Sequence, residues 1–361
     1  MSAQKPAHTP AGKPARTPAG SIEVIAPNLK RRLSGVTSTI VRLVPIQAEK
    51  MGVVATGPGL PEHVPHIALW KLPFLSRRTR VWHARRNVEM LLGLVLKNLF
   101  RSKLKLLFTS ASQRQHSGYT KWLISRMDAV IATSHKTQSY LECDATVSHH
   151  GINTDDFQPA GDRAALRQQL GLPDDVLIGC YGRIRHQKGT DAFVDAMIRI
   201  LPDLPGHTAL VMGRATEKHL AFLDGLKKRV AAEGLAERIL FLPEVPVHQV
   251  AAWYQVLDLF VAPQRWEGFG LTPLEAMACG VPCVATRVGA FEELLSDEAV
   301  GTLVARDDVA ALADASMAWL ADPERMVAGA SAARAHVLAH FRIEGEAERL
   351  MAIYRQLLEQ R

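Results

Sequence analysis

Two glutamates, Glu267 and Glu275, stand with seven residues between them in the segment EGFGLTPLE, directly after a short apolar run at 259–262. Gly268 and Gly270 lack a side chain, so the backbone of this segment can approach a ligand closely. A helix that begins after such a loop offers free N–H groups and a positive dipole end to an anion. The pattern predicts a phosphate or diphosphate site at this corner of the chain.

The start of that helix is predicted at Thr272, with Pro273 at its first position. Glu275 lies three residues after Thr272, which is the spacing of a capping box. Each glutamate alone also has a plain structural explanation, since Glu275 would cap the helix and Glu267 would be a solvated loop acid. The combination with the neighbouring glycines favours a binding site.

A second loop, GRIRHQKGTD at 182–191, follows the apolar run at 176–181. Arg183, as a planar fork, and Lys188, as a point charge, could reach the same phosphates from the opposite side of a crevice. The loop lacks the order of a P-loop, and no G-x-G-x-x-G follows a strand, so a dinucleotide oxidoreductase loses its usual fingerprint. The chain contains no D-x-D, which weighs against a metal-held nucleotide sugar.

The elements that must position these loops alternate between short β-branched or apolar runs and longer segments of helical period. This alternation is typical of parallel α/β sheets. The runs predicted as strands are 22–25, 52–55, 106–108, 129–133, 176–181, 208–212, 239–242, 259–262 and 282–286. The residues WHA at 82–84 are predicted to be the end of a further strand.

The length of 361 residues is too great for one ordinary core and fits two lobes. Polar and proline-bearing breaks place the linker near 155–172, which gives Rossmann-like domains at 21–165 and 166–342 and a last amphipathic helix over about 343–361. Residues 1–20 carry basic residues and prolines without an apolar core, so we expect a disordered tail rather than a secretory signal. We therefore expect a cytoplasmic protein.

Charge is divided unevenly along the chain. Residues 1–160 hold 22 Lys and Arg against 9 Asp and Glu, a net charge of +13, which leaves −6 for the remainder of a chain whose total is +7. Such asymmetry suggests that the first half meets an anionic partner such as nucleic acid, an anionic lipid surface or an acidic substrate. Few aromatic residues interleave with the basic ones, which argues against stacking on single-stranded nucleic acid.

The two motif loops together resemble those of the retaining glycosyltransferases of family four. EGFGLTPLEAMACGVP is similar to the E-x7-E motif of this family, GRIRHQKGTD to its basic diphosphate loop, and HHGINTDDFQP at 149–159 to its hinge segment. The resemblance covers residues 21–361. It implies a GT-B fold, in which two Rossmann-like, doubly wound parallel-sheet domains face a crevice and the last helix packs back on the first domain.

The resemblance also implies roles for individual residues. Arg183 and Lys188 would bind the donor diphosphate, and Glu275 would hold the ribose hydroxyls. Glu267 would touch the transferred sugar as the catalytic residue. Because fixed cations and helix-end amides can stabilise the leaving group, we expect no metal or other cofactor. The backbone amides expected to contact sugar and phosphate are those of Gly268, Phe269, Gly270, Leu271 and Thr272.

The first half resembles bacterial lipopolysaccharide core biosynthesis mannosyltransferases, on NLKRRLSGVTSTIVRL at 28–43, VWHARRNVEML at 81–91 and the segment 104–134. That resemblance implies GDP-mannose as donor and places Gly35 in a turn facing the donor phosphates. Many relatives carry a histidine just after the fifth strand, where this chain reads FTSAS at 108–112. His116 or His83 could substitute for it, although a lone histidine is more often structural.

The basic residues of the first half are expected to serve an anionic, lipid-linked acceptor. Arg31, Arg32, Arg85 and Arg86, with His83 and His116, would meet the carboxylates and phosphates of a lipopolysaccharide inner core. Arg77, Arg78, Arg101, Lys103 and Lys105 would meet an anionic bilayer, so we expect peripheral attachment to the inner face of the cytoplasmic membrane.

Several alternatives remain open at this stage. Another family-four enzyme could use a UDP- or ADP-linked sugar on a different glycan or lipid-linked acceptor, because E-x7-E is shared by enzymes with many donors. An epimerase or a phosphorylase could use the same fold. A nucleic-acid-binding protein would explain the basic first half but would leave both phosphate loops without a purpose, so we expect no nucleic-acid partner.

Overall fold

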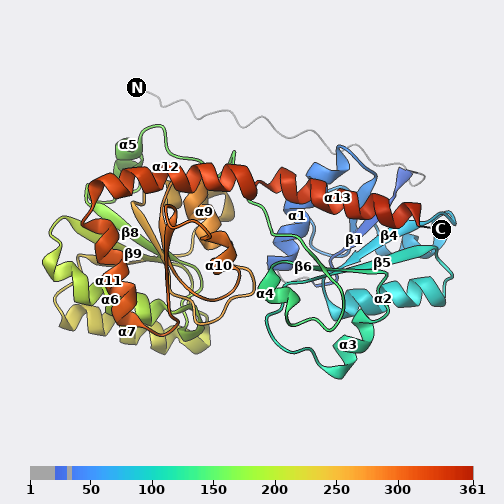
Figure 1. The fold of residues 1–361 in the computed structure, drawn as a ribbon, viewed down its shortest axis with the longest axis horizontal. Coiled ribbons are helices and arrows are strands. Elements are labelled where there is room, and N and C mark those ends of the chain that lie inside the picture. Colours follow the sequence, from blue (N-terminus) through green and yellow to red (C-terminus); the bar gives the residue numbers. More distant parts are fainter. Residues whose placement is uncertain (1–20, 31–34, 361) are drawn as a thin grey trace.

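The computed structural model describes residues 21–30 and 35–360 and consists of two lobes that lie side by side along the long axis (Figure 1). The predicted disordered tail, Arg31 and Arg32 lie outside the described residues. Each lobe is built around one parallel sheet.

The first lobe holds a seven-stranded sheet in the order β3-β2-β1-β4-β5-β6-β7, in which every pairing is parallel. Its strands are β1 (Val24–Pro27), β2 (Val53–Thr56), β3 (His66–Ile67), β4 (Arg80–Ala84), β5 (Leu104–Ser110), β6 (Ala129–Ala132) and β7 (Thr146–Val147). Its helices are α1 (Gly35–Ala48), the 3-10 helix η2 (Leu69–Phe74), α2 (Asn87–Asn98), α3 (Gly118–Ile124) and α4 (His135–Gln138).

The second lobe holds a six-stranded parallel sheet in the order β10-β9-β8-β11-β12-β13. Its strands are β8 (Val176–Tyr181), β9 (His207–Met212), β10 (Ile239–Leu242), β11 (Leu259–Ala262), β12 (Cys283–Thr286) and β13 (Gly301–Val304). Its helices are α5 (Arg163–Gln169), α6 (Thr190–Ile200), α7 (Leu220–Ala232), α8 (Val250–Gln255), α9 (Thr272–Ala278), α10 (Phe291–Leu294), α11 (Val309–Leu320) and α12 (Pro323–His340), with short 3-10 turns at η3 (His186–Lys188), η4 (Leu201–Asp203), η5 (Glu217–His219) and η6 (Val247–Gln249).

Both sheets have the doubly wound strand order, in which the chain moves outward on one side of the first strand and then on the other. The central strands are buried on both faces, as expected for parallel sheets covered by helices. In the second lobe, for example, Phe260 of β11 faces one apolar layer and Val261 faces the other. The predicted α/β class with two Rossmann-like domains is confirmed.

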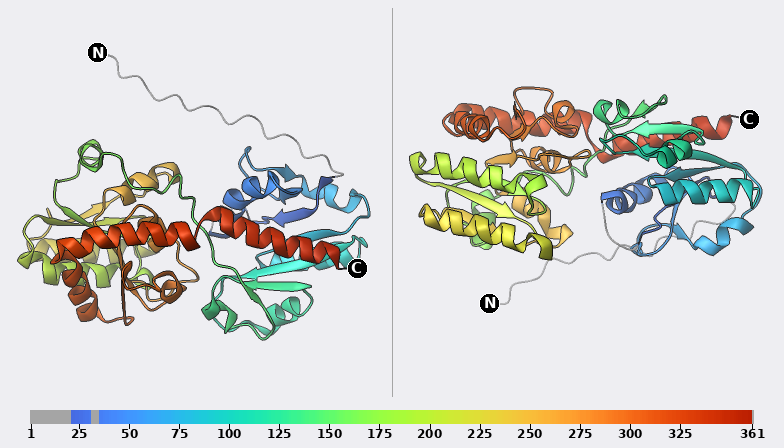
Figure 2. Two further views of the ribbon diagram at one scale, coloured as in Figure 1. Left: turned by 45° about the horizontal axis from the view of Figure 1, so that its top comes forward. Right: turned by 90° about the horizontal axis from the view of Figure 1, so that it is seen from below.

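The chain crosses between the lobes twice. The first crossing runs through residues 148–152 and the second through residues 341–343, between α12 and α13 (Ile343–Glu359). Helix α12 covers the second lobe and α13 covers the first, and Figure 2 shows the two following one another along the molecule. Leu350 and Tyr354 of α13 are buried in the same core cluster as Val24 of β1. The segment expected as linker, 155–172, contains α5, and both Phe157 and Leu166 pack on the second lobe's core.

None of the described helices is both long and apolar enough to cross a bilayer.

Candidate functional site

The two motif loops leave adjacent strands of the second sheet. The basic loop follows β8 and the EGFG loop follows β11, and these strands are neighbours through the pairing of Leu259 with Ile178. The strand order reverses between β8 and β11, and ligands of doubly wound sheets bind outside the carboxyl ends of the strands at such a point. The topology therefore brings together two loops that lie about 80 residues apart in the sequence.

Two glycines allow the loops to take their shape. Gly270 has φ of 92°, a conformation that disfavours any residue with a Cβ, and Gly189 has φ of 69° at the end of the basic loop. A Cβ on Gly189 would also clash with the carbonyl oxygen of Pro263, so the backbones of the two loops are in close contact. Arg265 fixes them further, because its guanidinium donates to the carbonyl of His186 at 2.7 Å and to Asp191 at 2.6 Å.

The predicted capping box is wrong. Helix α9 does begin at Thr272 with Pro273 beside it, but Leu271 occupies the capping position and no side chain caps the helix. The Thr272 hydroxyl is buried without a hydrogen-bond partner. Glu275 instead accepts a hydrogen bond of 2.8 Å from the phenol of Tyr254. No side chain therefore caps the first-turn amides of α9, and the Glu275 carboxylate does not serve as a cap.

Glu267 and Lys188 form an ion pair across the two loops. The other carboxylate oxygen of Glu267 accepts from the backbone N–H of Gly268 at 3.0 Å, which holds the start of the glycine loop. Lys188 and Glu267 are both only partly exposed, so the pair is shielded from bulk solvent. The structure therefore joins the lysine predicted for the diphosphate to the glutamate predicted for the sugar.

A cavity of about 360 Å³ opens between the lobes above these loops. Its floor in the second lobe includes Arg183, Leu271, Thr272 and Glu275, while Ser38 and Arg42 of α1 line it from the first lobe. The guanidinium Nε of Arg42 is buried without a hydrogen-bond partner. The remaining lining residues are Phe157, Tyr181, Gly182, Met212, Gly213, Arg214, Glu244, Val245, Val247, Val250 and Tyr254.

The environment of Glu275 suits a hydrogen bond to uncharged hydroxyl groups. Burial raises the pKa of the Glu275 carboxyl, although the hydrogen bond from Tyr254 and the charge of Arg42 act in the opposite direction. Neither Arg42 nor Tyr254 was predicted from the sequence. A signal was present for Arg42, because it lies two helical turns after Gly35 and so shares a helix face with the turn expected at the phosphates.

The loop after β5 of the first lobe reaches the EGFG loop directly. Gln113 donates from its side-chain amide to the carbonyl of Gly268 at 2.9 Å, and the indole of Trp266 approaches the carbonyl of Gln113 at 3.4 Å. A Cβ on Gly268 would lie 2.8 Å from the carbonyl oxygen of Ala111, so only glycine fits there. Gln113 was not predicted, although it closely follows the FTSAS segment in which many relatives carry a histidine.

His83 and Arg86 lie in the interior of the first lobe rather than on the cavity wall. His83 is buried and contacts the phenol of Tyr354 at 2.7 Å and the hydroxyl of Thr109 at 2.6 Å, so both ring nitrogens are occupied. Burial, with the nearby charge of Arg85, lowers the pKa of His83 well below its ordinary value. Arg86 forms an ion pair of 2.8 Å with buried Glu89. These contacts fit a structural role for both residues.

The other first-lobe candidates are Arg85, His116 and Gly35. Arg85 donates to the carbonyl of His83 at 3.2 Å. His116 lines a separate pocket with Trp122, has a buried and unpartnered Nε2, and has a pKa lowered by burial and by the charges of Arg114 and Lys121. Gly35 is the first residue of α1. Of the described acceptor candidates, His83, Arg85 and Arg86 therefore lie together at the carboxyl end of β4, whereas His116 lies apart from them.

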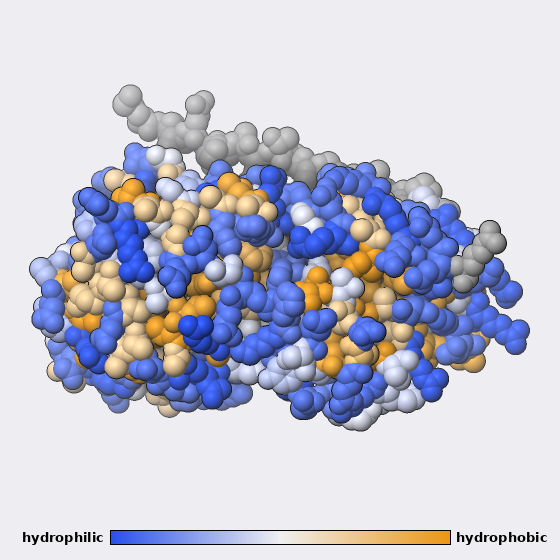
Figure 3. Space-filling model, viewed as in Figure 1, coloured by the Kyte–Doolittle hydropathy of each residue, from blue (hydrophilic) through white to orange (hydrophobic). Residues whose placement is uncertain are grey.

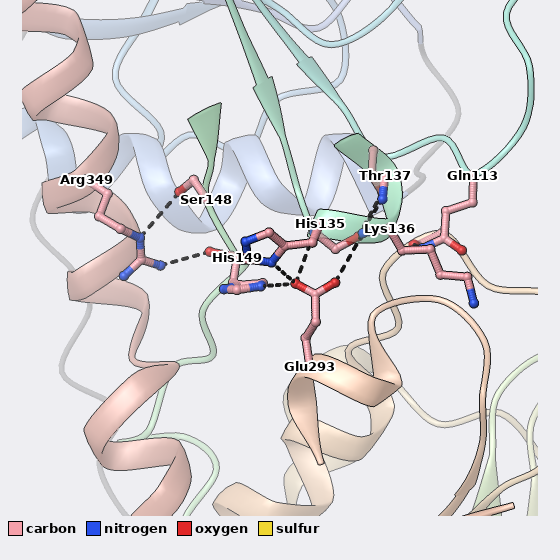
Figure 4. Close-up of polar contacts among 10 residues, drawn as sticks. Gln113, His135, Lys136, Thr137, Ser148, His149, Glu293 and Arg349 are labelled. Atoms are coloured by element: carbon pink, nitrogen blue, oxygen red, sulfur yellow. Dashed lines mark hydrogen bonds and ion pairs between the residues drawn. The ribbon is translucent and has the colours of Figure 1, made fainter. Parts of the chain in front are cut away.

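A separate polar cluster joins the lobes at α4 and α10. His135, His149 and Glu293 each place one potential ligand atom within 4.8 Å of the others, an arrangement that could hold a metal ion. Glu293 already accepts hydrogen bonds from both imidazoles and from two backbone N–H groups (Figure 4). The Glu293 carboxylate thus has four protein donors.

Comparison with known proteins gives a consistent result. The profile of the family described as glycosyl transferases group 1 matches residues 162–336. The chain is 54% identical to the lipopolysaccharide core biosynthesis mannosyltransferase LpsB of Rhizobium meliloti and 52% identical to LpcC of Rhizobium leguminosarum bv. viciae, in each case over 93% of this chain and 98% or 97% of the relative. Among solved structures, Anabaena HepE in complex with UDP superposes with a TM-score of 0.81 at 18% identity, over 93% of this chain and 100% of that one. This chain belongs to the group 1 glycosyltransferases and is a glycosyltransferase.

Proposed function

We propose that the enzyme transfers mannose from GDP-mannose, with retention of anomeric configuration, to the Kdo region of a lipopolysaccharide inner core. Two relatives above 50% identity carry names that specify lipopolysaccharide core mannosyl transfer, and each aligns over nearly its whole length. The observation that carries the proposal in this chain is the meeting of both motif loops below one interlobe cavity.

The chemistry follows from where charge develops. Breaking the bond between the anomeric carbon and phosphate leaves negative charge on the diphosphate and positive charge on the sugar ring. Arg183 and Lys188 supply fixed cations for the leaving group, and the first-turn amides of α9 add a helix dipole. Glu267, paired with Lys188, lies beside these groups, where its carboxylate can contact the sugar. Because these groups supply the charge, we propose that transfer needs no metal ion.

The nucleoside part of the donor occupies the cavity in this proposal. Glu275 accepts from the ribose hydroxyls, while Arg42 approaches from the first lobe and completes the enclosure only when the lobes are together. Water is excluded from the crevice in this closed form, which limits hydrolysis of the donor.

A thermal-shift panel of GDP, UDP and ADP tests the donor assignment. A nucleotide at 100 times its dissociation constant adds about 2.7 kcal/mol to the free energy of unfolding, so the preferred base should give the largest rise in Tm. We expect GDP to give that rise. A shift with UDP or ADP as large as the shift with GDP would overturn the assignment of GDP-mannose and favour another nucleotide sugar.

The acceptor is proposed to be presented at an anionic membrane, because the first lobe exposes a mixed apolar and basic surface. Trp70 and Phe74 of η2 are 68% and 82% exposed, and Leu99 and Phe100 after α2 are 74% and 48% exposed. Figure 3 shows hydrophobic and hydrophilic groups side by side at this outer end of the first lobe, on the right of the view. We call this surface, formed by η2 and the segment 99–105, the outer face.

Basic side chains surround these apolar groups. Arg77, Arg101 and Lys103 line one pocket together with Pro73 and Phe100, which shows that the two segments of the outer face are adjacent. Amphipathic surfaces with tryptophan and basic residues are suited to the interface of an anionic bilayer. Each cation near such a surface contributes about 1 kcal/mol, and the attraction fades within about 8 Å at physiological salt. Arg78 is a weaker candidate, because it donates to the carbonyl of Ile22 at 2.9 Å.

The outer face and the crevice lie at opposite ends of β4. Arg77 precedes the strand and Arg85 follows it, and a strand of five residues spans about 13 Å. An acceptor anchored at the outer face must therefore extend its glycan along the lobe to reach the crevice. A lipid-linked oligosaccharide has this shape, whereas a free sugar would have no use for the outer face.

Vesicle sedimentation tests membrane binding. We expect the protein to pellet with anionic but not neutral vesicles and to do so less at high salt. The triple variant R101Q, K103Q, K105Q and the double variant W70S, F74S should both pellet less while binding GDP like the wild type. V327S removes an exposed apolar side chain from the second lobe and should pellet normally. Equal pelleting with neutral vesicles, or normal pelleting of both outer-face variants, would contradict the proposal.

A further inference from the structure

The two crossings between the lobes are bonded to one another beside the EGFG loop. Ile152 donates its N–H to the carbonyl of Phe341 at 2.8 Å, and Ile343 donates to the carbonyl of Ile152 at 3.0 Å. A Cβ on Gly151 would lie 2.5 Å from the carbonyl oxygen of Arg342, so the two segments are in close contact. Any change in the angle between the lobes must therefore pass through this pair of segments.

One crossing carries two adjacent histidines, each of which is held by a carboxylate. His150 contacts Glu346 of α13 at 2.8 Å, and the second oxygen of Glu346 accepts from the N–H of Gly151 at 2.7 Å. His149 contacts Glu293 of α10 at 2.6 Å. The histidines are thus anchored in opposite directions, one to each lobe.

Glu293 also binds the first lobe directly. It accepts from the backbone N–H of His135 at 3.0 Å and of Lys136 at 3.3 Å, and from the imidazole of His135 at 2.9 Å (Figure 4). These N–H groups belong to the first turn of α4, so a carboxylate of the second lobe caps a helix of the first. Burial alone would raise the pKa of Glu293, but the hydrogen bonds from His149, His135 and Lys136 lower it, which keeps the cap ionised.

Phe269, in the middle of the EGFG loop, packs against both histidines. Its ring meets that of His150 edge to face with centroids 4.9 Å apart and lies 6.3 Å from the ring of His149. The carbonyl of Phe269 accepts from the N–H of Ala290, the residue that precedes α10, at 3.1 Å. The loop is therefore enclosed by the crossing on one side and by the helix that carries Glu293 on the other.

We propose that His149 and His150 are positioning residues, which fix the EGFG loop through Phe269 and tie its geometry to the contact between the lobes at Glu293. In this arrangement the phosphate-facing amides reach their working positions only when α4 is bound to Glu293. The inference rests on the proposed donor role of the EGFG loop. The side chains of His149, His150 and Glu293 do not line the donor cavity. The two histidines act on the loop through their ring contacts with Phe269, and Glu293 acts through His149.

Variants of Glu293 and His149 test this coupling. E293A removes the cap and both imidazole contacts. E292A alters the neighbouring exposed residue, whose carboxylate forms solvent-exposed ion pairs with Lys136 and Arg287. We expect E293A to lower kcat per GDP-binding site by about tenfold or more, with the donor KM changed by less than about threefold. E292A should match the wild type. H149F keeps a ring against Phe269 and should retain more activity than H149A.

Hydrogen exchange of the loop provides a readout that does not depend on the donor. Without any ligand, backbone amides of residues 268–272 should exchange about tenfold faster in E293A and H149A than in the wild type and E292A. Unchanged exchange in both variants, or a loss of kcat that only follows the loss of folded, GDP-binding protein, would overturn the proposal. A wild type without transfer from GDP-mannose would count against the proposed function, while the exchange experiment would still decide this inference.

Discussion

The two lobes share one strand order but differ in how they present charged residues at the carboxyl ends of their strands. In the second lobe, Arg183 and Lys188 follow β8, while Glu267 lies on the loop after β11 and Glu275 lies in the first turn of α9, all at the reversal of strand order. In the first lobe, the equivalent end of the sheet holds His83 and Arg86, whose polar atoms bind other residues of the same lobe.

The spacing of residues in a motif predicts the local backbone shape, whereas the partners of a single charged side chain depend on the tertiary structure around it. A motif that combines glycines with charged residues fixes a local backbone shape, and topology then places it at the ligand-binding edge. A basic residue without such a local pattern is as well suited to an internal ion pair as to a substrate.

Replacement of Glu267 should have the largest effect. E267Q keeps an oxygen for the N–H of Gly268 but removes the charge paired with Lys188. We expect kcat to fall on the order of 100-fold, since the group faces charge that develops in the transition state, with a smaller change in donor KM. E237Q, an exposed residue of the same lobe, serves as control. Wild-type turnover in E267Q would show that the motif is only structural.

Replacement of Glu275 should act on binding instead. E275Q weakens a charged hydrogen bond to ribose, so the donor KM should rise about tenfold with little change in kcat. Because Glu275 does not cap α9 and a glutamine can still accept from Tyr254, the Tm should stay close to that of the wild type. Steady-state kinetics and a thermal melt distinguish the two effects. A large loss of stability with normal KM would instead place Glu275 in the structural framework.

Replacement of Glu346, which holds His150 and Gly151 between the lobes, should have a pH-dependent effect of intermediate size on the free energy of unfolding. Burial opposes the charge of Glu346, but the charge and hydrogen bond of His150 and the N–H of Gly151 lower the pKa of Glu346 from that of an ordinary glutamate. A carboxyl whose folded pKa is lowered stabilises the protein above its unfolded pKa, and this stabilisation is lost as the pH falls through the folded value.

E346Q should therefore be less stable than the wild type by about 1–3 kcal/mol near neutral pH, and the difference should shrink as the pH falls through the lowered pKa of Glu346. Denaturant unfolding of both proteins at several pH values measures it. A difference that stays constant down to the acid-unfolding region would contradict the ionised state assigned to Glu346.

Chelation should have the smallest effect. Because Arg183, Lys188 and the helix amides supply the positive charge at the leaving group, transfer should continue in EDTA at an unchanged rate. Activity that disappears in EDTA and returns only with added Mn²⁺ or Mg²⁺ would show that the second lobe needs a metal ion in addition to its cations.

Much of the fold was predictable from local pattern. The runs at 176–181 and 259–262 coincide with β8 and β11, because central strands buried on both faces read as continuous apolar stretches. The run at 239–242 coincides with the edge strand β10, whose residues ILFL are all apolar. Strands β3, β7 and β13 were not predicted. Their sequences are HI, TV and GTLV, so each lacks the continuous apolar run of at least four residues that marks the edge strand β10.

The site was predictable only where the sequence fixes a backbone shape. The two loops were found because glycine and charged residues occur together in them. Tyr254 and Gln113 were not found, because each reaches the site from a distant segment and looks in sequence like an ordinary core or loop residue. The capping box failed for a related reason: spacing cannot show that Glu275 turns toward Tyr254 rather than toward the helix end.

Calorimetric titration with GDP tests most directly whether the second lobe alone holds the donor diphosphate. The double variant R183A, K188A should bind GDP at least about 100-fold more weakly than the wild type, since two charge-assisted contacts are removed. The outer-face variant R101Q, K103Q, K105Q removes more positive charge but should bind GDP with wild-type affinity. Equal GDP affinity in R183A, K188A and the wild type, or a comparable loss in the outer-face variant, would contradict the account.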